Sequence, residues 1–335
     1  KNGDIEGAVV TGALTRMTGE DVGMYAIQQG TIDAGGNYTI NFTSADFEIT
    51  PATLDITADA GQNKVYGDPD PVFSYQVAGL KNGDIQGAVV TGALTRMAGE
   101  DVGTYAIQPG TIAAGPNYTI NFTSADFEIT PATLTVTADA GQTKIYGDAD
   151  PAFTYQYTGL KNGDANTVLT GALARAVGED VGTYAINQGS LSAGPNYTIN
   201  FTGADFAITP RTLNITANAN QAKVYGSADP VFAYTASNFG NGDNTSILTG
   251  ALSRAAGEDV GMYAITIGTL DAGMNYVINF TSADFEIAEK VLNVTADAGQ
   301  GKVFGTADPT LTYQVTGFEN GDDETILTGA LARAA

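Results

Sequence analysis

The chain repeats itself with a period of about 80 residues, and this periodicity limits the folds that it can adopt. An Asn-Gly-Asp turn recurs at intervals of 80, 80, 79 and 79 residues, starting at Asn2, Asn82, Asn162, Asn241 and Asn320. Long similar segments follow each turn. Repetition at such an interval is typical of tandem structural units that pack against their neighbours. We therefore expect an array of small modules in place of one large domain.

A second recurrent motif predicts where the modules begin. A Phe-x-Ile-Thr-Pro segment places prolines at Pro51, Pro131 and Pro210, and an altered copy has Glu289 in that place. Proline lacks a backbone N–H and suits the first residue of a strand or a connection. The chain thus starts and stops inside a repeat, and we expect it to be a window of something longer. The predicted limits are a partial repeat at 1–50, whole repeats at 51–130, 131–209 and 210–288, and a partial repeat at 289–335.

Alternation of apolar and polar residues predicts strands within each repeat. In the repeat 51–130 this pattern occupies residues 53–58, 73–77 and 118–122, and turn residues follow every 8–12 positions. Six or seven short strands of this kind indicate a small sandwich or barrel. Asn37-Tyr38-Thr39 and Asn41-Phe42-Thr43, with their later copies, match the N-glycosylation pattern, but the alternation of a strand explains them equally well.

One segment leaves the fold open between two alternatives. Residues 88–96 are compatible with one helical turn or with a strand, and the β-branched residues of the later copies favour a strand. A helix favours a β-grasp-like module, and a strand favours an immunoglobulin-like sandwich. The expected class is all-β, or β-rich with one short helix per unit. About four residues join consecutive units, which is too few for free swivelling, so we expect an elongated, semi-rigid rod.

The composition excludes several functions. The chain has no Cys, His or Trp, which excludes disulfides, thiolate or imidazole metal sites, and catalysis by Ser–His or Cys–His pairs. Its net charge of −23 disfavours nucleic acids and anionic membranes as partners. The sequence has no run of about 18 apolar residues, the length that would predict a membrane span. We expect no enzymatic activity, no nucleic-acid partner and no membrane insertion within this segment.

The most metal-like pattern is an Asp-x-Asp-Pro corner. Calcium takes six to eight oxygen ligands, more than one such corner supplies. The first acid is replaced by Ser227 and Thr306 in later repeats, which favours a role in capping backbone N–H groups of the turn. No cofactor is expected, and calcium is the one alternative left open. The candidate calcium ligands are Asp68, Asp70, Asp148 and Asp150.

Two other recurrent pairs have a structural interpretation. Lys64 and Tyr66 resemble acid–base machinery, but the last copy has Phe304, which lacks the hydroxyl. We interpret the pair as an aromatic ring packed on the sheet and covered by the lysine. Arg96 lies four residues before Glu100, and we expect an ion pair that closes a hairpin.

The motifs together resemble a known family of repeats. They are Lys-(Val/Ile)-Tyr-Gly-(Asp/Ser), Leu-Thr-Gly-Ala-Leu, Glu-Asp-Val-Gly-x-Tyr-Ala-Ile and Asn-Tyr-x-Ile-Asn-Phe. This set resembles the MBG (YGX-type) and YDG families of repeats in large bacterial surface adhesins and filamentous-haemagglutinin-like proteins. Phe304, Ser227 and Thr306 depart from it. The resemblance implies an extracellular, all-β, stalk-forming module that has no catalytic residues.

Three functions follow from these observations as hypotheses. The first is a structural stalk or extender of a bacterial cell-surface adhesin or secreted fibre, whose partners are the neighbouring repeats of the same chain. The second is a low-affinity multivalent module that binds host or surface glycans or mucin. The third is the subunit of a self-assembling extracellular filament, in which other copies of the chain are the partners.

Overall fold

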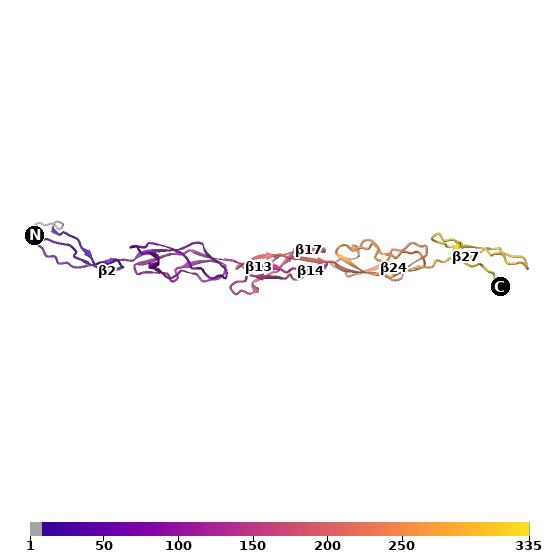
Figure 1. Ribbon diagram of the computed structural model, residues 1–335, viewed down its shortest axis with the longest axis horizontal. Helices are drawn as coiled ribbons and strands as arrows, with labels where there is room; N and C mark the ends of the chain where they lie inside the picture. Colours follow the sequence, from indigo (N-terminus) through magenta and orange to yellow (C-terminus); the bar gives the residue numbers. More distant parts are fainter. Residues whose placement is uncertain (1–8, 335) are drawn as a thin grey trace. The chain divides into compact units, whose positions relative to one another are not determined.

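The computed structural model describes residues 9–334, in which nearly all regular structure is β (Figure 1). The predicted turn at Asn2 lies outside these residues. Among the described residues, no helix is long and apolar enough to cross a membrane. The chain forms two compact units, each of which contains one whole repeat. One holds the residues up to 137 with 156–171 and 190–202, and the other holds 138–155, 172–189 and the residues from 203 onward.

The first sheet of the repeat 51–130 has three strands, in the order β11-β4-β6. They are β4 (Ala52–Ala58), β6 (Tyr75–Ala78) and β11 (Tyr118–Thr123). β4 pairs in parallel with β11 and antiparallel with β6. Leu54 and Ile56 point inward from β4, are fully buried and form a core with Val90. The alternation seen in the sequence therefore predicts this face correctly.

The second sheet of this repeat has four strands, in the order β5-β12-β9-β8. β5 pairs in parallel with β12, and β12 pairs antiparallel with β9. Phe127 of β12 is fully buried and meets Phe73 edge to face, with ring centroids 5.2 Å apart. The strands are β5 (Gln62–Val65), β8 (Thr95–Arg96), β9 (Gly103–Gln108) and β12 (Asp126–Thr130), and a separate two-stranded pair joins β7 (Val90–Thr91) to β10 (Ala113–Ala114).

The other whole repeats have the same two sheets. In 131–209 they are built from β13 (Ala132–Ala138), β15 (Tyr155–Thr158) and β18 (Tyr197–Thr202), and from β14 (Gln142–Ile145), β16 (Ala174–Arg175), β17 (Gly182–Asn187) and β19 (Asp205–Thr209). In 210–288 they are built from β20 (Arg211–Ala217), β22 (Tyr234–Ser237) and β25 (Tyr276–Thr281), and from β21 (Gln221–Val224), β23 (Ser253–Arg254), β24 (Gly261–Thr266) and β26 (Asp284–Ala288).

The partial repeats contain parts of this pattern. The strands before Pro51 are β1 (Thr15–Arg16), β2 (Gly23–Gln28) and β3 (Asp46–Ile49), and those after Glu289 are β27 (Asn293–Ala296) and β28 (Tyr313–Thr316).

The segment 88–96 is a mixture of the two predicted alternatives. It begins in α2 (Gln86–Val89), a single helical turn with no buried residue, and continues into β7 and β8. The later copies have short 3-10 turns here: η1 (Asn166–Val168), η2 (Thr245–Ile247) and η3 (Glu324–Ile326). The strand prediction is thus wrong for the first residues, and the helix is too short and too exposed to cover a sheet as β-grasp packing requires.

Gly92 explains why the segment cannot continue as one element. Its φ is +86°, and a Cβ there would lie 2.1 Å from the backbone oxygen of Thr111. The chain therefore turns sharply between β7 and β8, because only glycine adopts this conformation at so close an approach.

Candidate functional site

Several recurrent side chains meet where one repeat joins the next. Tyr66 follows β5 and is buried, and its hydroxyl donates to Oδ2 of Asp164 in the next repeat at 3.0 Å. The hydroxyl of Tyr197 donates to the same oxygen at 2.7 Å. The two tyrosine rings meet edge to face, with centroids 5.4 Å apart. Asp164, the last residue of an Asn-Gly-Asp turn, thus receives one tyrosine from each of two neighbouring repeats.

The next junction is built in the same way. Tyr146 donates to Asp243 at 2.9 Å, and Tyr276 donates to the same carboxylate oxygen at 2.8 Å. Burial, with the nearby Asp243 carboxylate, raises the pKa of both tyrosines above the usual value of 10.0. Both hydroxyls are therefore protonated donors at neutral pH.

The glycine after each junction tyrosine admits the neighbouring repeat. Gly67 has a φ of +78°, and a Cβ on it would lie 2.5 Å from Cβ of Lys161 and 3.0 Å from the backbone nitrogen of Asn162. Gly147 is equally close to Asn241, with 2.5 Å between the added Cβ and the backbone nitrogen. The Tyr-Gly pair is thus a junction motif, in which the tyrosine binds the next turn and the glycine leaves room for it.

An asparagine makes a second set of hydrogen bonds at the junction between 51–130 and 131–209. Asn196 accepts a hydrogen bond from the backbone N–H of Val102 at 2.9 Å and donates to Oδ1 of Asp101 at 2.8 Å. This residue was a match to the glycosylation pattern, and its amide is instead occupied by the preceding repeat. The same two bonds join Asn117 to Asp21 and Val22, and Asn275 to Asp180 and Val181.

A cluster of four charged residues lies on the second sheet of each whole repeat. Lys64 Nζ contacts Asp70 at 2.7 Å and Glu100 at 2.6 Å, and Arg96 contacts the same two carboxylates, each at 2.7 Å. The Lys64 and Arg96 side chains are only 5% exposed. The predicted Arg96–Glu100 pair is confirmed, and the sequence did not reveal the two further members. The equivalents are Lys144, Asp150, Arg175 and Glu179, and Lys223, Asp229, Arg254 and Glu258.

The four groups hold one another in their charged forms. The hydrogen bond from Lys64, followed by that from Arg96, lowers the pKa of Glu100. Burial acts to raise the pKa of Asp70, but the hydrogen bonds from Arg96 and Lys64 outweigh it and leave that pKa lowered. Burial likewise acts to lower the pKa of Lys64, and its two carboxylate partners leave it raised. No member of this cluster is prepared to exchange a proton near neutral pH.

The calcium candidates lie in ion pairs. Asp70 and Asp150 belong to the charged clusters, while Asp68 pairs with Lys161 at 3.1 Å and Asp148 pairs with Arg211. The oxygens of Asp70 receive Lys64 and Arg96 side chains instead of capping backbone N–H groups, so that interpretation was wrong. Within residues 9–334, no three acidic side chains are grouped as a metal site would require.

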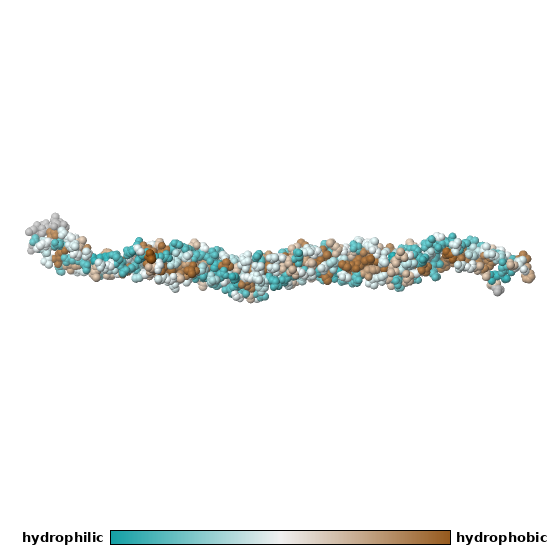
Figure 2. Space-filling view, viewed as in Figure 1, coloured by the Kyte–Doolittle hydropathy of each residue, from teal (hydrophilic) through white to brown (hydrophobic). Residues whose placement is uncertain are grey.

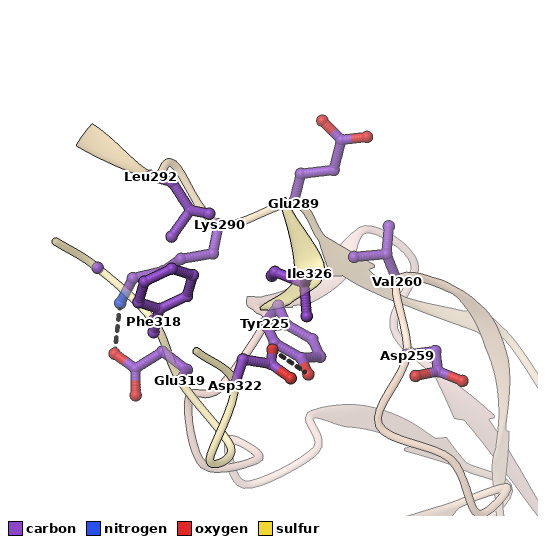
Figure 3. A pocket seen from close by; sticks show the side chains of 11 residues that line it. Tyr225, Asp259, Val260, Glu289, Lys290, Leu292, Phe318, Glu319, Asp322 and Ile326 are labelled. Atoms are coloured by element: carbon purple, nitrogen blue, oxygen red, sulfur yellow. Dashed lines mark hydrogen bonds and ion pairs between the residues drawn. The ribbon is translucent and has the colours of Figure 1, made fainter. Parts of the chain in front are cut away.

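Figure 3 shows the junction between the repeat 210–288 and the residues that follow it. A pocket of about 370 Å³ lies there, lined by the Tyr225–Asp322 hydrogen bond of 3.0 Å and by the Lys290–Glu319 ion pair of 2.7 Å. Asp259 lines the same pocket in the place where Asp180 binds Asn275 at the preceding junction.

Comparisons with known proteins identify the family. No curated protein matches the chain. A crystal structure of the I9–I11 tandem from titin is 11% identical, covers 72% of this chain and 98% of that chain, and has a TM-score of 0.18, which is too low to bear on the fold. The family model described as MBG domain (YGX type) matches five successive segments: 1–48, 54–128, 134–207, 213–286 and 292–335. The chain, a tandem array of β modules, therefore belongs to the MBG domain (YGX type) family.

Proposed function

We propose that these repeats form a non-catalytic stalk or extender in a bacterial cell-surface adhesin or extracellular fibre. The proposal rests on one observation: recurrent polar side chains form hydrogen bonds between neighbouring repeats. Tyr66, Asp101, Asp164 and Asn196 all bond across a junction between neighbouring repeats. A module whose repeated chemistry serves its neighbours is suited to holding a fixed spacing along a chain.

The charged groups of the repeats also support a non-catalytic role. A general acid or base needs a pKa near the working pH and access to substrate. The carboxylates of Asp70 and Glu100 have lowered pKa values and are held by Lys64 and Arg96. We therefore assign the cluster to the stability of the second sheet.

Extracellular placement is part of the same proposal. Membership of the family favours it, and so does the net charge of −23, which keeps neighbouring chains apart in solution. On the face seen in Figure 2, hydrophilic residues separate the hydrophobic patches. Exposed apolar side chains such as Val72 are ordinary on a protein surface.

Small-angle X-ray scattering of the 335-residue chain tests the proposal. We expect an elongated monomer whose scattering curve does not change with concentration. The double variant Tyr66→Phe/Asn196→Ala removes bonds at one junction and should broaden the distribution of distances between spin labels on the two adjoining repeats. Tyr263→Phe is the matched control, because the Tyr263 hydroxyl bonds to the backbone oxygen of Asp259 in its own repeat, away from this junction.

The alternatives give different results in the same samples. Fibres that appear as the protein concentration rises would favour the self-assembling filament over the stalk. Saturable binding on a glycan or mucin array, with an affinity that grows with the number of repeats, would favour the multivalent binding module over the stalk. A compact monomer would contradict the stalk without supporting either alternative.

A further inference from the structure

Three positions at each junction vary together from one repeat to the next. The corner position follows the junction glycine of the preceding repeat, and its residues are Asp68, Asp148 and Ser227. The strand position follows the boundary proline or its substitute, and its residues are Ala132, Arg211 and Lys290. The turn position precedes the Asn-Gly-Asp turn, and its residues are Lys161, Gly240 and Glu319.

At the first of these junctions, the turn position supplies the cation. Nζ of Lys161 lies 3.1 Å from Oδ1 of Asp68 in the preceding repeat. The strand position holds Ala132, which is buried and uncharged. One negative corner residue thus meets one positive residue of the following repeat.

At the second junction, the strand position supplies the cation instead. The guanidinium of Arg211 contacts the carboxylate of Asp148 and donates to the backbone oxygen of Tyr146 at 2.7 Å. The turn position holds Gly240. The corner acid is again matched by a single positive charge of the following repeat, which now comes from the strand position instead of the turn position.

The cations of the two arrangements compete for the same space. A Cβ on Gly240 would lie 2.7 Å from Nε and 3.1 Å from Cδ of Arg211 and 2.9 Å from the backbone oxygen of Tyr146, so Arg211 occupies the space that a side chain at the turn position would enter. Gly240, which has no side chain, thus leaves free at the turn position the space that the Arg211 side chain fills from the strand position.

The third junction has no corner acid and no net charge opposite it. Ser227 occupies the corner, and Lys290 pairs at 2.7 Å with Glu319 of the same following repeat (Figure 3). Summed over the strand and turn positions, the following repeat carries one positive charge where the corner is Asp and none where the corner is Ser.

We propose that these three positions form a matching set that determines which repeat fits next to which. A repeat with an acidic corner accepts a neighbour with one net positive charge at the strand and turn positions, and a repeat with Ser at the corner accepts a neutral one. This inference concerns the fit of neighbours and holds whether the array is a stalk, a binding array or a filament.

A double-mutant cycle in the 335-residue chain tests the match. Lys161→Gly removes the cation, and Ala132→Arg adds a side chain that collides with Lys161. The double variant Ala132→Arg/Lys161→Gly reproduces the second junction at the first. The measurement is amide hydrogen exchange at residues 161–164, which reports this junction separately from the rest of the repeat.

We expect faster exchange in both single variants, by about 2- to 5-fold for Lys161→Gly and more than about 10-fold for Ala132→Arg. The double variant should return to within about 2-fold of the parent, because the coupling cancels both losses. Lys81→Gly is the matched control, since Lys81 occupies the same place in its repeat and makes no ion pair with any residue from 9 to 334. The control measures the cost of glycine at this turn without a cross-junction partner.

A second transplant keeps the proposal testable if Ala132→Arg alone does not fold. Lys161→Glu should speed exchange by placing an acid opposite Asp68. The triple variant Asp68→Ser/Ala132→Lys/Lys161→Glu reproduces the third junction and should restore slow exchange. Losses that simply add in the double variant, or a triple variant no better than Lys161→Glu, would overturn the matching set.

Discussion

The hydroxyl of Tyr66 donates to the carboxylate of Asp164, which lies 98 positions later in the sequence and in the next repeat. A buried hydroxyl needs a hydrogen-bond partner, and here the neighbour provides it. The repeat 51–130 therefore has one of its own buried polar groups satisfied only through contact with 131–209. Adjacent repeats should stabilise one another for this reason.

Tyr66→Phe should lower the free energy of unfolding by about 0.5–1.5 kcal/mol, the usual net value of one hydrogen bond. Asp164 keeps its bond from Tyr197, so the loss should not grow to that of an unpaired buried charge. Denaturant unfolding of the 335-residue chain measures the change. Tyr263→Phe removes an exposed bond inside the repeat 210–288 and should cost less. Equal losses in the two variants would argue against a special role for the junction.

Gly67→Ala should be more destabilising than Gly61→Ala. The two glycines have nearly equal φ values of +78° and +77°, so both substitutions incur the same backbone strain of about 1 kcal/mol. Only Gly67 faces the next repeat, whereas a Cβ on Gly61 meets nothing within 4 Å. The difference between the two melting temperatures isolates the contact across the junction. Two equal melting temperatures would show that the neighbouring turn moves aside without cost.

Acid should weaken the repeats through the carboxylates of the charged cluster. The pKa values of Asp70 and Glu100 are lowered from 3.8 and 4.5, so their contribution is present above those values and is lost as the pH falls through the lower folded-state values. The pKa of Lys64 is raised above 10.5, so its contribution is lost only above that pH. Unfolding midpoints should therefore be flat between about pH 5 and pH 9. A maximum confined to acid pH would contradict these directions.

Lys64→Met should cost about 1–3 kcal/mol of stability, because Asp70 and Glu100 then share Arg96 alone. Methionine keeps most of the buried volume, which separates the loss of charge from the loss of packing. Lys81→Met, at an exposed position, is the control and should change the stability little. Chemical unfolding at neutral pH compares the two. A neutral Lys64→Met variant would mean that Arg96 alone satisfies both acids.

Chelators should leave the melting temperature unchanged. The oxygens of Asp70 and Asp150 are already held by Lys64 and Arg96 and by Lys144 and Arg175. Calcium binding at these corners would have to displace those cations. Calorimetric scans with calcium and with excess chelator make the comparison. A melting temperature that rises with calcium would restore the corner acids as ligands.

The sequence predicted those features that depend on a residue and its near neighbours. Alternation identified β4 with Leu54 and Ile56 inward, and the i to i+4 spacing identified Arg96 with Glu100. The bond of Asn196 to Asp101 joins residues 95 apart, and no local pattern distinguishes it from a chance glycosylation triplet. The available signal was recurrence itself, since an asparagine and an aspartate that reappear in each repeat without a partner nearby indicate a contact between repeats.

The segment 88–96 shows a different limit. Its apolar residues fit a helix and a strand equally, because a single turn and two short strands are each too brief to establish a period. What decides the outcome is the approach of Thr111 to Gly92, which is a contact between distant parts of the repeat.

The parallel pairing of β4 with β11 has a mechanical consequence. A force on the two ends of the repeat 51–130 pulls β4 from its first residue and pulls β11, through β12, from its last residue. The two paired strands are thus pulled in opposite directions along their lengths. The ladder from the Ala52–Tyr118 pair to the Thr57–Thr123 pair is then loaded in shear, so its bonds must yield together instead of opening one after another. Single-molecule stretching should therefore show abrupt, high-force rupture of each repeat, and gradual peeling at low force would contradict this geometry.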